Sequence, residues 1–286
     1  MSNLLVNIVI GLLVGVVSGI GVHLLLKIDT LRKGRHLPLL LNFPQNEKLF
    51  IVYPPRPREY QLLPTASTED FMGINNLISA LVSIGWDSEK FIVRDTTRLS
   101  EKEWEKNNIV VICSPKANTL SKEIQEKLRD NKVHFYYFTK VIIEDVEQWV
   151  ISDGNGFFPS PTYKTNQKYR QESDSVSEEI EIKDIDTPLH AQSLEDLAVI
   201  TKIRNPWNPS YQILLVAGLR GIGSWGAAET LKKWYDVIYR AKKRSLVKYR
   251  KSGSFSALIK IYYRNSDIVG VELINLIEID DLSHSG

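Results

Sequence analysis

The chain has 286 residues, 43% of them hydrophobic and 24% charged, and this composition excludes a disordered tail. Its 36 Lys and Arg stand against 34 Asp and Glu, so a formal net charge of +2 gives no indication of a polyanionic partner. The single cysteine, Cys113, excludes an internal disulfide framework and a cysteine-rich zinc site.

The first predicted element is a membrane-spanning helix. Residues 4–26 carry no Asp, Glu, Lys or Arg, and their length as a helix, roughly 34 Å, is enough to cross a hydrocarbon core of about 30 Å. Basic residues follow at once within 27–35, and such residues stay on the cytoplasmic side. We therefore expect residues 1–36 to anchor the chain in the inner (plasma) membrane with its N-terminus outside, rather than to form a cleaved signal peptide.

Small residues recur along this predicted helix. Gly11, Gly15 and Gly19 are spaced by four and fall on one stripe, where a second backbone approaches closely. The stripe predicts a homo-oligomer formed through the membrane helix. The alternative is that glycine is simply common in membrane helices.

Residues 37–47 contain two prolines and predict a linker, and residues 48–286 predict one cytosolic domain. A β-rich run at 48–53 precedes a helix that Ser67 or Thr68 can cap, with an apolar stripe from Phe71 to Val82. Further along the chain we expect strands at 91–93 and 109–113 and helices at 99–105 and 120–129. This alternation predicts an α/β sheet.

The second half of the domain has a different pattern. Strand character continues at 133–138 and 141–151, and residues 152–196 then form an acidic insertion rich in glycine and proline, with a binding role or with none. Two runs, 197–203 and 212–217, flank the turn 205–209 and predict a hairpin. A helix at 224–244 and an antiparallel pair, 255–263 with 268–279, close the chain.

The expected fold class is therefore α/β. A single N-terminal transmembrane helix is followed by a Rossmann-like mixed sheet with helices on both faces and C-terminal antiparallel strands.

A glycine-rich turn between the run 212–217 and the next helix is the strongest motif in the chain. Glycines there let a phosphate approach bare amide groups, and the helix start adds unpaired N–H donors. The candidate ligand-binding residues of this turn are Gly218, Arg220, Gly221, Gly223, Ser224 and Gly226. No acidic residue ends the following strand to hold a ribose, so an NAD-dependent dehydrogenase is not favoured. The alternative is a turn required only for close packing of strand and helix.

A second turn follows the run 109–113 and has similar logic. Ser114, Lys116, Asn118 and Thr119 are polar groups where a strand ends and a helix starts. If both turns face one crevice, they make a composite site for a nucleotide or cyclic nucleotide. The alternative is ordinary helix capping by Asn118 or Thr119.

Two segments carry a family resemblance, IVVICSPKANTLSKEI and DLAVITKIRNPWNPSYQILLVAGLRGIGSWGAAETL. They resemble an uncharacterised bacterial Rossmann-like domain, and the glycine turn resembles the nucleotide-sensing domains of bacterial defence and second-messenger systems. The resemblance implies a ligand sensor joined to a membrane effector, and it supplies no catalytic residues.

Other chemistry has little support. The five histidines are scattered, so no metal site is expected, and Glu229 is a candidate general base or a solvated helix carboxylate. The basic aromatic run 232–251 suits contact with anionic lipid or a solvated helix face, and nucleic-acid binding is not favoured. The sequence thus predicts a membrane-tethered sensor of a nucleotide-like anion, with a scaffold or a nucleotide-processing enzyme as the alternatives.

Overall fold

The structure is a computed structural model, which describes residues 43, 47–55, 66–161, 194–234, 253–264 and 267–279. The predicted span 4–26 with its glycine stripe, the basic residues up to 36 and residues 235–251 lie outside these ranges. Within the described ranges no helix is long and apolar enough to cross a membrane.

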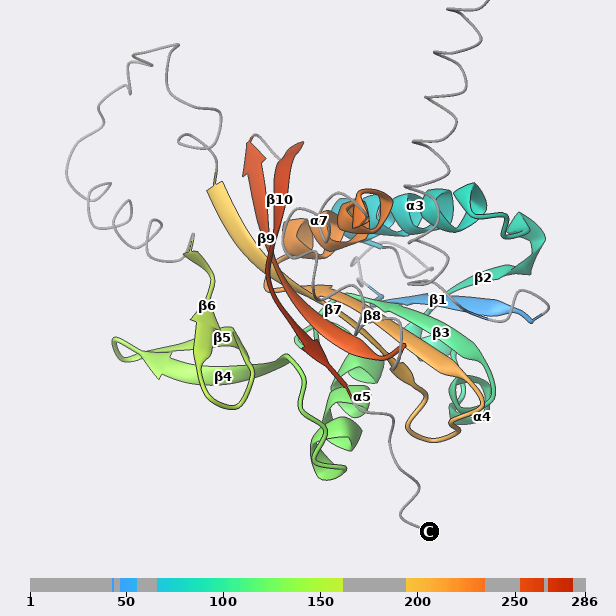
Figure 1. Cartoon of the computed structure of the whole chain (residues 1–286), viewed down its shortest axis with the longest axis horizontal. Helices are drawn as coiled ribbons and strands as arrows, with labels where there is room; N and C mark the ends of the chain where they lie inside the picture. The colour runs from blue at the N-terminus through green and yellow to red at the C-terminus, as the bar shows by residue number, and fades with distance from the viewer. Residues whose placement is uncertain are drawn as a thin grey trace, which may run out of the picture.

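A seven-stranded mixed sheet forms the centre of the fold, with strand order β10-β9-β7-β8-β3-β1-β2 (Figure 1). Its strands are β1 (Leu49–Tyr53), β2 (Phe91–Asp95), β3 (Asn108–Ile112), β7 (Leu194–Arg204), β8 (Gln212–Gly218), β9 (Phe255–Arg264) and β10 (Asp267–Glu278). The four neighbours β2, β1, β3 and β8 run parallel, whereas β7, β9 and β10 are added in antiparallel pairs. The predicted hairpin of β7 with β8 and the predicted C-terminal pair are both confirmed.

Helices cover both faces of the sheet, as the sequence predicts. The helices α3 (Thr68–Ser83) and α7 (Gly221–Lys232) share one apolar cluster with Ile51, while α5 (Thr119–Asp130) shares a second cluster with Val52 on the opposite face. Successive side chains of a strand point to opposite faces, so the central strands are apolar along their whole length. Every residue of β3 is buried.

Local capping fixes where two of these helices begin. The Ser67 side chain accepts a hydrogen bond from the N–H of Asp70 at 3.1 Å, which confirms Ser67 as the N-cap of α3. The short helix α4 (Glu101–Glu105) begins with a capping box between Ser100 and Glu103, and it is preceded by a 3₁₀ turn at Thr96–Arg98.

A separate three-stranded antiparallel sheet lies beside the main one and contains β4 (Tyr137–Ile143), β5 (Val146–Ser152) and β6 (Phe157–Pro159) (Figure 1). The strand expected over 133–138 begins only at Tyr137, because Phe135 and Tyr136 are drawn into the core, where the N–H of Tyr136 donates to Ser256 Oγ at 3.1 Å. The segment 152–196, expected to be an irregular insertion, contains strand structure at both of its ends. The strand β6 lies near its beginning, and β7 starts before its end. Residues 162–193 are outside the described ranges.

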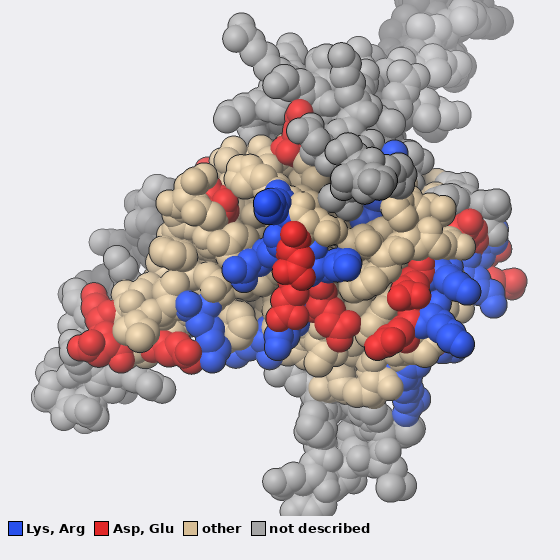
Figure 2. Space-filling view, turned by 90° about the horizontal axis from the view of Figure 1, so that it is seen from below, with Lys and Arg blue, Asp and Glu red and all other residues tan. Residues whose placement is uncertain are grey.

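The described surface carries charges of both signs. Over the face seen in Figure 2, Lys and Arg alternate with Asp and Glu. Ion pairs such as Lys122 with Glu126 (3.8 Å) and Lys140 with Glu147 (2.7 Å) join neighbours of opposite sign. On this face the charges are interspersed, which suits a solvated surface better than a nucleic-acid footprint.

One lysine lies inside the core. Lys202 on β7 is 3% exposed, its Nζ lies 6.0 Å from the centre of the Phe43 ring, and no ion pair joins it to a described carboxylate. Burial lowers the pKa of Lys202 from 10.5 to about 8. Between those two values the unfolded chain holds more protons than the folded one, so this group favours unfolding at neutral pH and stability recovers as pH rises above about 8.

Replacing Lys202 with methionine tests how much stability the buried ammonium group costs. We expect Lys202→Met to raise the free energy of unfolding at pH 7 by about 1–2 kcal/mol, since the apolar stem is kept and the buried charge is removed. Urea unfolding of the full chain measures the change, with the exposed Lys122→Met as control. A less stable Lys202→Met protein would show that the ammonium group is net stabilising.

Candidate functional site

The two turns predicted to bind a ligand lie at the same edge of the sheet. Strands β3 and β8 are parallel neighbours, paired from Ile109 with Ile213 to Ile112 with Val216. The helix that follows β3 packs on one face of the sheet and the helix that follows β8 packs on the other. In open α/β sheets ligands bind where adjacent chains depart to opposite faces.

Two helix starts meet at this edge. The helices α3 and α7 run side by side over one face of the sheet (Figure 1). A Cβ atom on Gly221 would lie 3.1 Å from Glu69 Cβ, so the first turn of α7 touches the first turn of α3. The positive ends of two helix dipoles are therefore close together.

The glycines of the turn are required by packing. At three of these glycines an added Cβ atom would lie less than 3.0 Å from a neighbouring atom. The neighbour is the Gly223 backbone for Gly218, Asp196 Oδ2 for Gly223 and the Ile261 side chain for Gly226. Ser224 Oγ accepts the N–H of Gly218 at 2.9 Å. These contacts give the four residues Gly218, Gly223, Ser224 and Gly226 a structural role that needs no ligand.

A buried carboxylate stands beside the start of α7. Asp196, at the start of β7, is fully buried, and its Oδ2 accepts the backbone N–H of Arg220 at 3.1 Å. Ser160 Oγ donates to Asp196 Oδ1 at 3.2 Å. Burial raises the pKa of Asp196 to about 6, and hydrogen bonds from the backbone of Leu197 and Arg220, with the Arg220 charge, oppose that rise. The carboxylate thus occupies the Arg220 amide that a ligand anion could otherwise use.

Sequence reasoning missed Asp196 as a site residue because it grouped this residue with the acidic insertion. The sequence feature that could have identified Asp196 is its position, because it directly precedes the apolar run of β7. Only the strand order reveals which helix start it faces.

In the turn after β3, some polar residues are buried and others are exposed. Asn118 is buried and caps α5: its Nδ2 donates to Ile112 O at 2.9 Å, and its Oδ1 accepts the N–H groups of Leu120 and Ser121. Ser114 is also buried, whereas Lys116 and Thr119 are exposed. Capping therefore explains Asn118, and Lys116 and Thr119 remain the accessible polar residues of this turn.

Charged side chains remain at this edge. Arg220 is half-buried and Lys116 is exposed, and no described residue forms an ion pair with either. Between the two turns, Cys113 holds a φ of 87°, a conformation that non-glycine residues rarely adopt. The edge thus combines the two cations Arg220 and Lys116 with the carboxylates of Asp196 and Glu69 and a left-handed backbone at the end of β3.

Glu229 connects α7 to α3. It accepts a hydrogen bond from Asn76 Nδ2 at 2.8 Å and pairs with Lys233 at 3.2 Å. These partners assign it a packing role. Among the described residues, no group of three or more His, Cys, Asp or Glu is placed to hold a metal ion.

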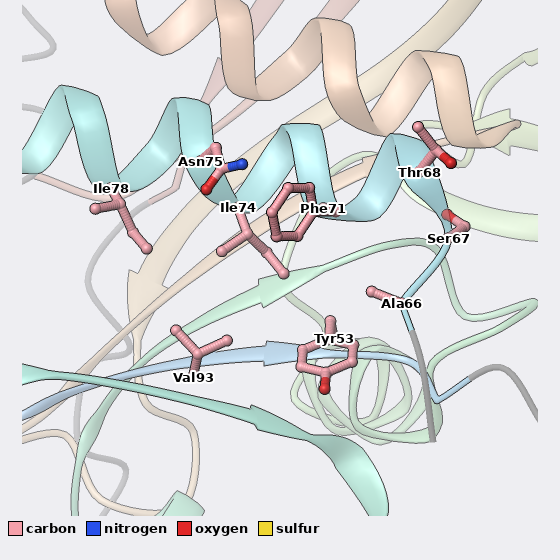
Figure 3. A pocket seen from close by; sticks show the side chains of 9 residues that line it. All are labelled: Tyr53, Ala66, Ser67, Thr68, Phe71, Ile74, Asn75, Ile78 and Val93. Atoms are coloured by element: carbon pink, nitrogen blue, oxygen red, sulfur yellow. The ribbon is translucent and has the colours of Figure 1, made fainter. Parts of the chain in front are cut away.

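A pocket of about 560 Å³ lies on the other side of the first turn of α3 (Figure 3). Ser67, Thr68 and Phe71 of this helix line it, with Tyr53 and Val93 at the strands opposite. The sequence stripe placed Phe71 and Val82 in the core, but they are 56% and 46% exposed. Positions 71, 75 and 78 follow one line at the margin of the apolar stripe, and this line borders the pocket, whereas Val82 lies outside it.

No protein-family model matches the chain, and no curated protein matches its sequence.

Proposed function

We propose that this protein is a receptor for a nucleotide-like anionic ligand. The observation that carries the proposal is the shared edge of β3 and β8: Arg220 stands at the start of α7, beside the first turn of α3, and Lys116 lies in the turn before α5. A bidentate guanidinium contact, a lysine charge and the dipole ends suit a phosphate group. The parallel order β2-β1-β3-β8 supports a Rossmann-like assignment of the sheet.

In this proposal the ligand signal passes to the membrane. Residues 4–26 tether the domain to the plasma membrane, and helices carrying Gly11, Gly15 and Gly19 self-associate when the ligand binds. The basic run 232–251 adds contact with anionic lipid through the residues that follow Trp234, because Trp234 is buried against Phe255 and Lys232 donates to Asn76 Oδ1.

A thermal-shift experiment on the detergent-solubilised full chain tests the ligand. The probes are inorganic phosphate, ATP, cyclic AMP, cyclic GMP and NAD. A probe at 100 times its dissociation constant adds about 2.7 kcal/mol of stability, which is a shift of several degrees. We expect Arg220→Ala to abolish that shift and Lys116→Ala to reduce it, while the exposed Lys122→Ala leaves it unchanged.

The alternative function is that of a membrane-tethered scaffold, and the close packing of the glycine turn favours it. In a scaffold this turn positions α7 and binds no ligand. This scaffold predicts that none of the probes shifts the melting temperature of the folded wild-type chain. Turnover of a probe that disappears with Arg220→Ala would instead indicate a nucleotide-processing enzyme.

A further inference from the structure

The pocket beside α3 is lined by two aromatic rings on opposed elements. Phe71 projects from the helix, with Ile74 and Ile78 on the same side, and Tyr53 and Val93 lie across from them on β1 and β2 (Figure 3). The Phe71 side chain is 56% exposed although it is large and apolar. An exposed aromatic residue at the wall of a pocket indicates a contact surface for a ligand.

The size of this pocket suits an organic ring system. Its volume of about 560 Å³ lies within the usual range for small-molecule sites, roughly 300–1,000 Å³. Thr68 and Asn75 are exposed polar residues of the lining, and their hydroxyl and amide groups provide donors and acceptors for the edge of a ring.

The described lining of the pocket offers no cation to a phosphate, because none of its residues is a lysine or an arginine. Asp70 belongs to the first turn of α3, and Asp95 ends β2. Burial and then the Asp95 charge raise the pKa of Tyr53, and Arg98, which pairs with Asp95 at 3.1 Å, opposes that rise. An uncharged ring fits these walls better than an anion does.

The pocket and the glycine turn adjoin opposite sides of one helical turn. Thr68 lines the pocket, and Glu69, the next residue, contacts the position of Gly221.

We propose that this pocket binds the uncharged base of a nucleoside, with the ring against Phe71 and Tyr53. The inference rests on the proposed function for the position of the phosphate, which stays at Arg220, but the base site binds a nucleoside on its own.

Calorimetric titration of the full chain with adenosine, guanosine, cytidine and uridine tests the pocket. We expect at least one to bind, Phe71→Ala to weaken binding tenfold or more, and Val93→Trp to block it by filling the pocket. Both positions are partly exposed, at 56% and 43%, so their fold is retained. Phe157→Ala, on β6 and 61% exposed, is the matched control and should bind like the wild type.

The outcomes separate the two proposals. Nucleoside binding that Phe71→Ala weakens and Arg220→Ala leaves unchanged supports the base site. Absence of nucleoside binding to the folded wild-type chain overturns the base site, while a nucleotide response that needs Arg220 would keep the proposed function. Equal affinity for nucleoside and nucleotide would keep the base site and remove the anion contact.

Discussion

Replacing Gly218 with alanine is expected to lower the free energy of unfolding by about 3 kcal/mol or more, the upper range for overpacking. A Cβ atom there would come within 3.0 Å of backbone atoms of Gly223 and Ser224, which no change of rotamer can relieve. The strand β8 and the first turn of α7 would have to separate, and the bond from the Gly218 N–H to Ser224 Oγ would be lost. Urea unfolding of the full chain measures the loss.

Gly73→Ala is the matched control, because Gly73 lies inside the α3–α7 contact. Its Cβ atom would meet Ala228, Ile112 and Trp225 at 3.8 Å, which is ordinary contact. Alanine is also the better helix former, by about 1 kcal/mol. We expect this variant to be as stable as the wild type or more stable. If Gly218→Ala were equally well tolerated, close packing would not explain the glycine turn.

The second large effect is a pH dependence caused by Asp196. Its pKa is 3.8 in the unfolded chain and about 6 in the folded one. Between these values the folded protein holds the extra proton, so stability falls as pH rises from about 4 to 6. The total loss is about 3 kcal/mol, from 1.36 kcal/mol per pKa unit.

Asp196→Asn removes this titration and keeps most of the local bonds. The amide oxygen still accepts the N–H of Arg220, and the amide nitrogen can donate to Ser160 Oγ. The difference in unfolding free energy between wild type and variant, measured by urea unfolding from pH 3.5 to 7, should change by about 3 kcal/mol in favour of the variant. Parallel stability curves for the two proteins would mean that Asp196 titrates in the folded state as it does when unfolded.

Local pattern was a good guide to most elements. The apolar run ending at Cys113 gave a fully buried strand, because a parallel strand covered on both faces needs no alternation. Asn205 within the predicted turn closes the β7–β8 hairpin: its N–H donates to Tyr211 O, and its Oδ1 accepts the N–H of Trp207. Ser67 and Asn118 were identifiable as caps because capping depends only on the next three residues.

The candidate site was less accessible to this reasoning. The sequence identified both turns, but whether the glycines pack or bind depends on Asp196 and Ile261, which lie more than 20 residues away along the chain. The pocket was missed because Phe71 has the helical spacing of a core residue, and only the position of α3 over β1 and β2 leaves its ring exposed.

The sequence by itself determined most strands, helices, caps and hairpins of the described domain, since these depend on the spacing of apolar residues and on hydrogen bonds between near neighbours. It did not predict β6, and it placed the start of α7 at Ser224, whereas the helix begins at Gly221. Only the tertiary structure decided that β3 lies beside β8, that α3 meets α7 at Gly221, and that a buried carboxylate faces the start of α7. The physical reason is that these contacts depend on strand order, because a strand with two apolar faces can pair equally well with any of several neighbours.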